Sequence, residues 1–160
     1  MKYAPLLIQG GNPIEKAMKK LIGLVLLVSA NIVFAQQAVK TVDMYENPSC
    51  PCCKNWAAYM RENGYKVNVH NVDDIDAARR KLGMPQKYGS CHTAVIGGYL
   101  VEGHVPVSDI QKLLTEKPKA IGLAVPGMVT GSPGMEGSNP QHYNTLLVRP
   151  DGSASVYAIH

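Results

Sequence analysis

The sequence is short of charge and of aromatic residues. Lysine, arginine, aspartate and glutamate make up 18% of its 160 residues, and aromatic residues make up 6%. No internal repeat is present, so the chain is expected to hold one compact domain with at most an appendage. Hydrophobic residues nevertheless reach 46%, which is enough to build a core and excludes global disorder.

No apolar run is long enough to span a membrane. Residues 21–30 are mostly apolar, but Asn31 interrupts the run and no basic cluster follows it, whereas a membrane-spanning helix needs about 20 apolar residues. A basic start at Lys19-Lys20 and a small-residue site ending at Ala35 flank the run, which is typical of a secretory signal peptide. The sequence therefore predicts a periplasmic protein, exported through a cleavable signal, with no membrane span after cleavage.

The chain divides into three predicted parts. Because Met18 is a better start for the signal than Met1, residues 1–17 are expected to be an over-extended N-terminus. The signal peptide occupies residues 18–35, and a single domain occupies residues 36–160. That domain has 12 basic and 11 acidic residues, so nucleic-acid binding has no electrostatic support.

Hydrophobic periodicity and turn residues predict an alternation of strands and helices in this domain. The expected elements are a strand at 38–45, a helix that starts at Pro51 and stops at Asn63-Gly64, a strand at 65–72, a helix capped by Asp73 and ended by Gly83, a hairpin at 93–102 around Gly97-Gly98, a helix at 106–116, a long loop at 117–139 rich in Gly, Pro and Met from residue 126 onward, and a closing hairpin at 145–159. The order β-α-β-α-β-β-α, with a Cys-rich turn before the first helix, predicts an α/β, thioredoxin-like fold with an additional C-terminal β-hairpin.

All four cysteines lie in the predicted domain, and three of them are crowded at one helix start. Cys50 and Cys53 form a C-x-x-C pair, with Cys52 between them in a CxCC motif. The N-terminus of a helix favours thiolate over thiol, and thiolate is both the nucleophile and the metal ligand. Cys91 comes just before a predicted strand, which in a thioredoxin-like sheet lies beside that helix start.

Three chemistries compete for these cysteines. Structural disulfides are expected in an oxidising compartment, but a bridge within four residues restrains little. A structural zinc site is less consistent with this spacing. Redox chemistry and the binding of a soft metal remain, and the residues around Cys91 favour metal binding. Thioredoxins carry a cis-proline at this point, whereas here Ser90, Cys91 and His92 precede the strand without a proline.

Further candidate ligands lie near the cysteines or in the loop. Met128 and Met135 lie in a Gly/Pro-rich segment without apolar periodicity, which makes them less easily explained as core residues. Thioethers and thiolates together select Cu(I) over harder metals. His92 neighbours Cys91, and His104 follows the predicted hairpin near the same edge, so either can be a ligand.

Several strings of this domain together resemble the exported copper-resistance CopG family, over about residues 38–160. They are the residues at 47–53 (NPSCPCC), 90–95 (SCHTAV), 102–106 (EGHVP), 122–128 (GLAVPGM) and 131–136 (GSPGME). The resemblance implies a thioredoxin-like fold, four cysteines that together bind one or more copper ions, and a role in copper tolerance in the periplasm.

The sequence thus predicts a copper-resistance protein that binds Cu(I) through Cys50, Cys52, Cys53 and Cys91. His92, His104, Met128 and Met135 are its expected auxiliary ligands. A multinuclear thiolate cluster, passive buffering, and an oxidoreductase activity that interconverts Cu(I) and Cu(II) all stay open. Other periplasmic copper-handling or export proteins are the expected partners. The alternative function is a thiol–disulfide oxidoreductase that uses the Cys50/Cys53 pair.

Overall fold

The computed structural model describes residues 40–160, and the predicted signal peptide and over-extension lie outside the described residues. The strands of this part form one mixed sheet in the order β2-β1-β3-β4-β5-β6-β7. Their bounds are β1 (Thr41–Glu46), β2 (Lys66–Asn71), β3 (His92–Ile96), β4 (Tyr99–Glu102), β5 (Gly122–Ala124), β6 (Asn144–Val148) and β7 (Ala154–Ile159).

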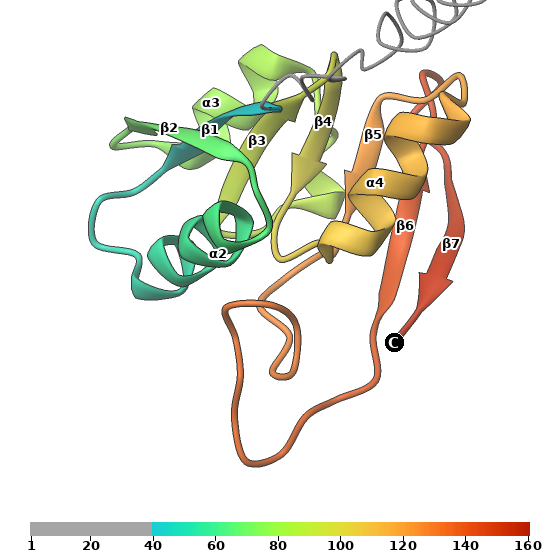
Figure 1. The fold of residues 1–160 in the computed structure, drawn as a ribbon. Helices are drawn as coiled ribbons and strands as arrows, with labels where there is room; N and C mark the ends of the chain where they lie inside the picture. Colours follow the sequence, from blue (N-terminus) through green and yellow to red (C-terminus); the bar gives the residue numbers. More distant parts are fainter. Residues whose placement is uncertain (1–39) are drawn as a thin grey trace, which may run out of the picture. The chain divides into compact units, whose positions relative to one another are not determined.

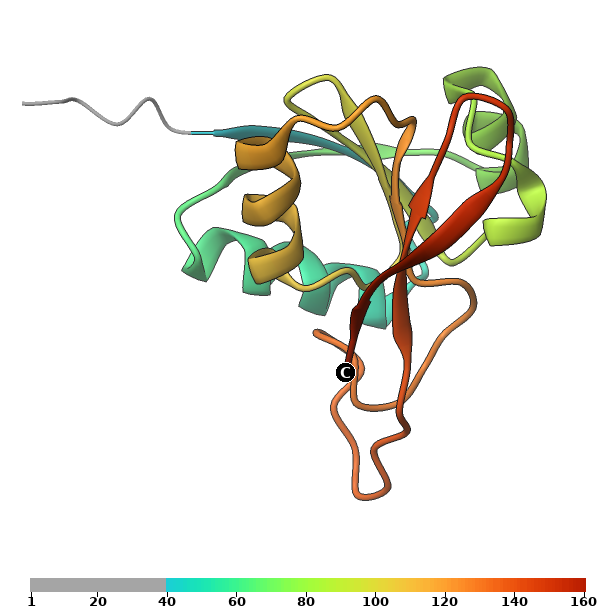
Figure 2. The ribbon, with the colours of Figure 1, turned by 90° about the vertical axis from the view of Figure 1, so that its right-hand side faces the viewer.

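Helices cover both faces of the sheet. They are α2 (Pro51–Glu62), α3 (Ile75–Leu82), the short 3-10 helix η2 (Gln86–Tyr88) and α4 (Val107–Glu116). Figures 1 and 2 show α2 and α4 on one face and α3 on the other. The larger core lies under α2 and α4, where Trp56, Met60 and Ile110 are fully buried, and a smaller core gathers around Met84 and Leu100.

The strand pairing places the cysteine-rich turn. β1 runs parallel to β2 and antiparallel to β3, so that Glu46 at the end of β1 pairs with His92 at the start of β3. The turn that follows β1 and the residue that precedes β3 therefore meet at one end of the sheet. This pairing brings Cys91 to the start of α2, as the sequence predicts.

Local chemistry accounts for most element boundaries. Gly97 and Gly98 both have positive φ angles, 58° and 87°, which only glycine adopts readily, and they close the β3–β4 hairpin. Pro51 occupies the first turn of α2, where its missing N–H costs nothing. The predicted helices and hairpins are confirmed at these places.

Two predicted details are wrong. Asp74 caps α3 with its side chain, in place of the expected Asp73. The segment expected to be a loop from residue 117 contains β5, which pairs with both β4 and β6 and joins the C-terminal hairpin to the sheet. A strand of three residues depends on its neighbours for hydrogen bonds, so its own sequence carries little signal.

The α/β class is confirmed, with three α-helices and a seven-stranded mixed sheet in residues 40–160. The narrower assignment to a thioredoxin-like topology stays a prediction. Within the same residues, no helix combines the length and the apolar character needed to cross a membrane.

Candidate metal centre

The start of α2 holds three of the four cysteines. Cys50 is the N-cap residue, and its sulfur accepts a hydrogen bond from the backbone N–H of Cys53 at 3.3 Å. The first turn of the helix contains no acidic residue. The positive end of the helix dipole therefore lies at these cysteines without a competing carboxylate in that turn, an arrangement that stabilises negative charge.

The four sulfurs converge, and all of them lie within 4.8 Å of one another. Cys52 Sγ lies 3.3 Å from Cys50 Sγ and 3.7 Å from Cys91 Sγ. Cys53 is buried and the other three are partly exposed, so the cluster lies at the surface of the core. The structure thus brings all four predicted cysteine ligands together.

Cys50 and Cys53 are joined by a disulfide, while Cys52 and Cys91 are free thiols. The bond is the one that a C-x-x-C pair forms. A disulfide sulfur is not a thiolate and is a poor metal ligand, so this oxidised state offers two thiols. Reduction is needed to make four thiolates available.

A second group of donors shares Cys91 with the first. His104 Nε2 lies 3.0 Å and His92 Nδ1 lies 3.6 Å from Cys91 Sγ. The two imidazoles meet edge to face, with ring centroids 5.0 Å apart, and both side chains are fully buried. The structure therefore places both predicted histidines at the cysteine site.

The protonation of His104 follows from its other contact. Nδ1 lies 2.8 Å from the carbonyl oxygen of Pro133. A carbonyl oxygen can only accept, so Nδ1 carries the proton and Nε2 presents its lone pair to Cys91. A hydrogen bond of this kind from the far nitrogen is the usual support of a metal-binding histidine.

Burial sets the charge state of the site without metal. It lowers the pKa of His104 and, together with the neighbouring His104, holds the pKa of His92 well below its ordinary value. Burial and the adjacent Cys52 raise the pKa of Cys91 to about 12. The imidazoles are therefore neutral ligands at pH 7, and a metal ion has to displace a proton from Cys91.

A buried ion pair holds the backbone before Cys91. Glu102 Oε1 accepts hydrogen bonds from Arg79 Nε at 2.8 Å and from the Ser90 N–H at 2.6 Å. Arg79 Nη2 donates in turn to the Ser90 carbonyl. Sequence reasoning missed both residues in this role. The available signal was a carboxylate at the end of the otherwise apolar run of β4.

The Gly/Pro/Met loop packs against the second turn of α2 and against Ser90. A Cβ on Gly134 would come within 2.7 Å of the Trp56 backbone nitrogen, and Ser90 Oγ donates to the Gly127 carbonyl. Met128 is 62% exposed and Met135 is half-buried. The loop therefore reaches the site through the Pro133 carbonyl, while copper ligation by the two thioethers stays a prediction.

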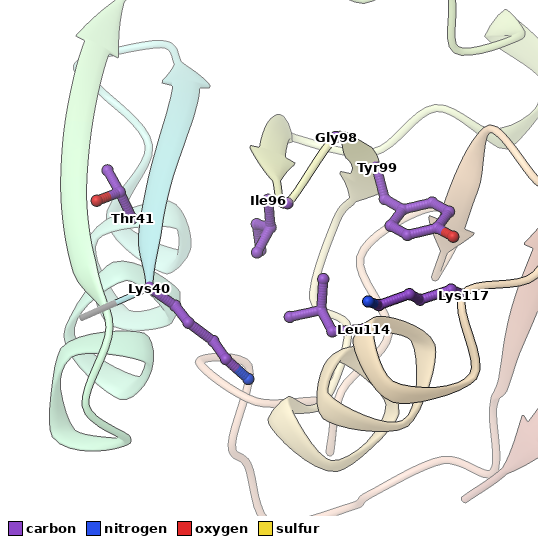
Figure 3. A pocket seen from close by; sticks show the side chains of 8 residues that line it. Lys40, Thr41, Ile96, Gly98, Tyr99, Leu114 and Lys117 are labelled. Carbon is purple, nitrogen blue, oxygen red and sulfur yellow. The ribbon is translucent and has the colours of Figure 1, made fainter. Parts of the chain in front are cut away.

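A pocket of about 600 Å³ lies at the other end of β1 and β3, lined by Lys40, Ile96, Leu114 and Lys117 among others (Figure 3). It is remote from the cysteines, since Thr41 and Ile96 are at the strand ends opposite Glu46 and His92. Its lining contains no cysteine or histidine. It therefore lacks soft metal ligands, and the candidate metal centre is the cysteine cluster.

Known proteins resemble this chain over most of its length. Two solved structures of copper resistance protein CopG, Form 2 and Form 1, are each 44% identical to it and cover 77% of it. The chain covers 99% and 98% of these structures, with TM-scores of 0.73 and 0.72. Residues 88–135 match the family described as "Protein of unknown function, DUF411". No curated protein matches the chain.

Proposed function

Because the chain belongs to the CopG family of copper resistance proteins, we propose that it is a periplasmic copper-resistance protein that binds Cu(I) through Cys50, Cys52, Cys53 and Cys91. The observation that carries this proposal is the convergence of four sulfurs within 4.8 Å. Thiolates are soft ligands that select Cu(I). The periplasmic location rests on the predicted signal peptide at 18–35.

Charge favours more than one copper ion. Four thiolates carry four negative charges, and a single Cu(I) leaves three of them uncompensated at a partly buried site. Uncompensated charge is costly away from water. Each additional Cu(I) bridged by two sulfurs removes one charge, so a multinuclear thiolate cluster is the form that we propose for the reduced protein.

The disulfide supports a redox role beside binding. Oxidation of the Cys50 and Cys53 thiols to a disulfide releases two electrons and two protons, and two Cu(II) ions that take up these electrons become two Cu(I). A Cys50–Cys53 disulfide, as present in the structure, is the product that this exchange would leave. In this proposal the protein is a copper oxidoreductase whose own thiols are the reductant.

The titration of reduced protein with Cu(I) under anaerobic conditions tests the binding proposal. We expect more than one Cu(I) per chain, and we expect Cys91→Ser to lose most of the copper because it removes the one sulfur that lies outside the CxCC motif. The Cys52→Ser variant is the test of the cluster. An endpoint at one ion that Cys52→Ser leaves unchanged would exclude the multinuclear form.

The auxiliary ligands have a separate test. His92 and His104 lie at the site, and the loop that carries Met128 and Met135 packs against α2 at Trp56. Thioethers are neutral, so they should hold Cu(I) without the pH dependence of thiolates. We expect the paired change Met128→Ala and Met135→Ala to leave the fold intact and to weaken Cu(I) retention against a chelator. Unchanged retention would remove both methionines from the ligand set.

The second candidate function is a thiol–disulfide oxidoreductase, and the Cys50–Cys53 disulfide favours it. In that function Cys50 attacks a substrate disulfide and Cys53 resolves the mixed disulfide, so Cys91 is dispensable. We expect only weak insulin reduction by the wild type. Strong reduction that persists in Cys91→Ser would make this the preferred function.

A further inference from the structure

The pocket at the end of the sheet remote from the cysteines has a mixed lining. Its volume is about 600 Å³, within the range of about 300–1,000 Å³ that is usual for pockets binding small organic molecules. Ile96, Tyr99 and Leu114 line it with apolar surface, and Lys40 and Lys117 add two ammonium groups. Figure 3 shows the two lysine side chains extending toward Leu114 from opposite sides. The pocket therefore combines apolar walls with positive charge.

No carboxylate balances this charge in the part of the chain that the structure describes. The lining contains neither Asp nor Glu, and within residues 40–160 no carboxylate oxygen lies within 4.0 Å of the Lys40 or Lys117 ammonium group. Lys112, on the same helix as the pocket wall, does have such a partner in Glu116 at 4.0 Å. An anionic group bound in the pocket would complement the charge of the two lysines.

The backbone of Lys117 supplies an independent observation. Lys117 follows the last turn of α4 with φ 49° and ψ 49°, and within residues 40–160 every other residue with a positive φ is a glycine. Glycine is the residue that usually ends a helix in this conformation, because a side chain is strained there. Strained backbone of this kind gathers at functional sites, where the side chain is needed. The ammonium group therefore explains this lysine better than the fold does.

The walls of the pocket are fixed by contacts between the β3–β4 hairpin and the end of α4. Tyr99 Oη donates a hydrogen bond to the Pro118 carbonyl at 2.9 Å, which ties β4 to the residue after Lys117. A Cβ on Gly97 would lie 2.6 Å from Leu114 Cδ2, so the hairpin turn lies directly against the helix. The pocket is thus formed before any ligand enters, as is usual for small-molecule sites.

We infer that this pocket binds a small organic anion, a carboxylate attached to an apolar body. The carboxylate lies between Lys40 and Lys117, and the apolar body packs on Ile96, Tyr99 and Leu114. Burial of the apolar body supplies affinity, and the two ammonium groups select an anion over a neutral or cationic analogue. The site is separate from the cysteine cluster, since it lies at the opposite end of β1 and β3.

Titration of the full ¹⁵N-labelled chain with octanoate tests the inference, and octylammonium is the cationic probe of the same length. The NMR signals of the Gly97 and Gly98 amides report occupancy, since both residues line the pocket. We expect octanoate to shift these signals in a saturable manner at concentrations up to about 10 mM. Octylammonium should bind about tenfold more weakly. No saturable shift with octanoate, or equal binding of the two probes, would overturn the inference.

The double change Lys40→Gln with Lys117→Gln should weaken octanoate binding about tenfold, because both positive charges are lost. Lys112→Gln is the matched control, since it removes a lysine of the same helix that does not line the pocket. It should leave octanoate binding unchanged. An affinity that survives the double change, or that Lys112→Gln lowers equally, would overturn the inference.

Lys117→Gly separates a role in binding from a role in the fold. Glycine adopts a positive φ without strain, so the midpoint of urea denaturation should rise while octanoate binding weakens. A lower midpoint with unchanged octanoate affinity would show that Lys117 serves the fold alone, and would overturn the inference.

Discussion

Removing the guanidinium of Arg79 should be among the most damaging single changes outside the cysteines. Its side chain is 3% exposed and it pairs with Glu102, which is fully buried. Arg79→Met keeps the length and apolar character of the side chain but leaves the Glu102 carboxylate without a counter-ion. The Ser90 carbonyl loses a donor at the same time.

The size of the loss follows from burial. Breaking a fully buried ion pair by removing one partner costs about 3–5 kcal/mol, because the remaining charge is left desolvated. Typical domains have a free energy of unfolding of only about 5–15 kcal/mol. Arg79→Met is therefore expected to remove a large fraction of the stability of this domain.

Asp76 provides the control, since it pairs with the same guanidinium but its side chain is 60% exposed. Exposed pairs contribute about 0–1 kcal/mol, so Asp76→Asn should cost no more than that. The double change Arg79→Met with Glu102→Gln removes both charges. It should cost less than the sum of the single changes, with a coupling of about 1–3 kcal/mol.

Urea denaturation of each variant, followed by the fluorescence of the single tryptophan, measures these losses. Trp56 is fully buried between α2 and the sheet, so its emission reports unfolding of the main core. An Arg79→Met variant as stable as Asp76→Asn, or single losses that simply add, would refute the reasoning about the buried pair.

Two further predictions concern Gly134 in the loop and Glu46 at the end of β1. Gly134→Ala should destabilise the domain by about 1–3 kcal/mol and speed hydrogen exchange in the loop, because its Cβ would meet the Trp56 backbone at 2.7 Å. Gly127→Ala, where φ is also positive but no atom lies within 4 Å, should cost only about 1 kcal/mol of backbone strain and leave the exchange unchanged. Burial raises the pKa of Glu46 above its ordinary 4.5, so the folded state is increasingly penalised as pH rises through that value. Glu46→Gln should remove this penalty, so the stability of the variant relative to wild type should grow from pH 4 to pH 7 in urea titrations. If the free energies of unfolding of the two proteins change with pH in parallel, Glu46 does not have a raised pKa.

Local chemistry explains what could be predicted from the sequence. Gly97 and Gly98 close a hairpin because both need positive φ angles, and Pro51 starts a helix because its φ is already helical. The convergence of Cys91 with the start of α2 could be predicted as well. It follows from the order of the elements once β3 is expected next to β1.

The remaining contacts depend on groups far apart in the chain. Arg79 and Glu102 are separated by 23 residues. No local sequence pattern around either residue shows that the two side chains pair with each other beside the Ser90 backbone. The Pro133 carbonyl reaches His104 from 29 residues away, through a loop whose path depends on the close approach of Gly134 to α2. Backbone carbonyls leave no mark in a sequence, so the support of His104 could not be predicted.

Three cysteines lie at the start of α2 and the fourth just before β3, which has a consequence for how the chain folds. Cys52 and Cys91 are 39 residues apart, and they meet only after β3 has paired with β1. In the unfolded chain the four sulfurs are therefore not held close together, and copper bound by all four would favour the native state. A ligand at 100 times its Kd adds about 2.7 kcal/mol in this way. Copper-loaded molecules would then unfold less often than empty ones and resist proteolysis for longer.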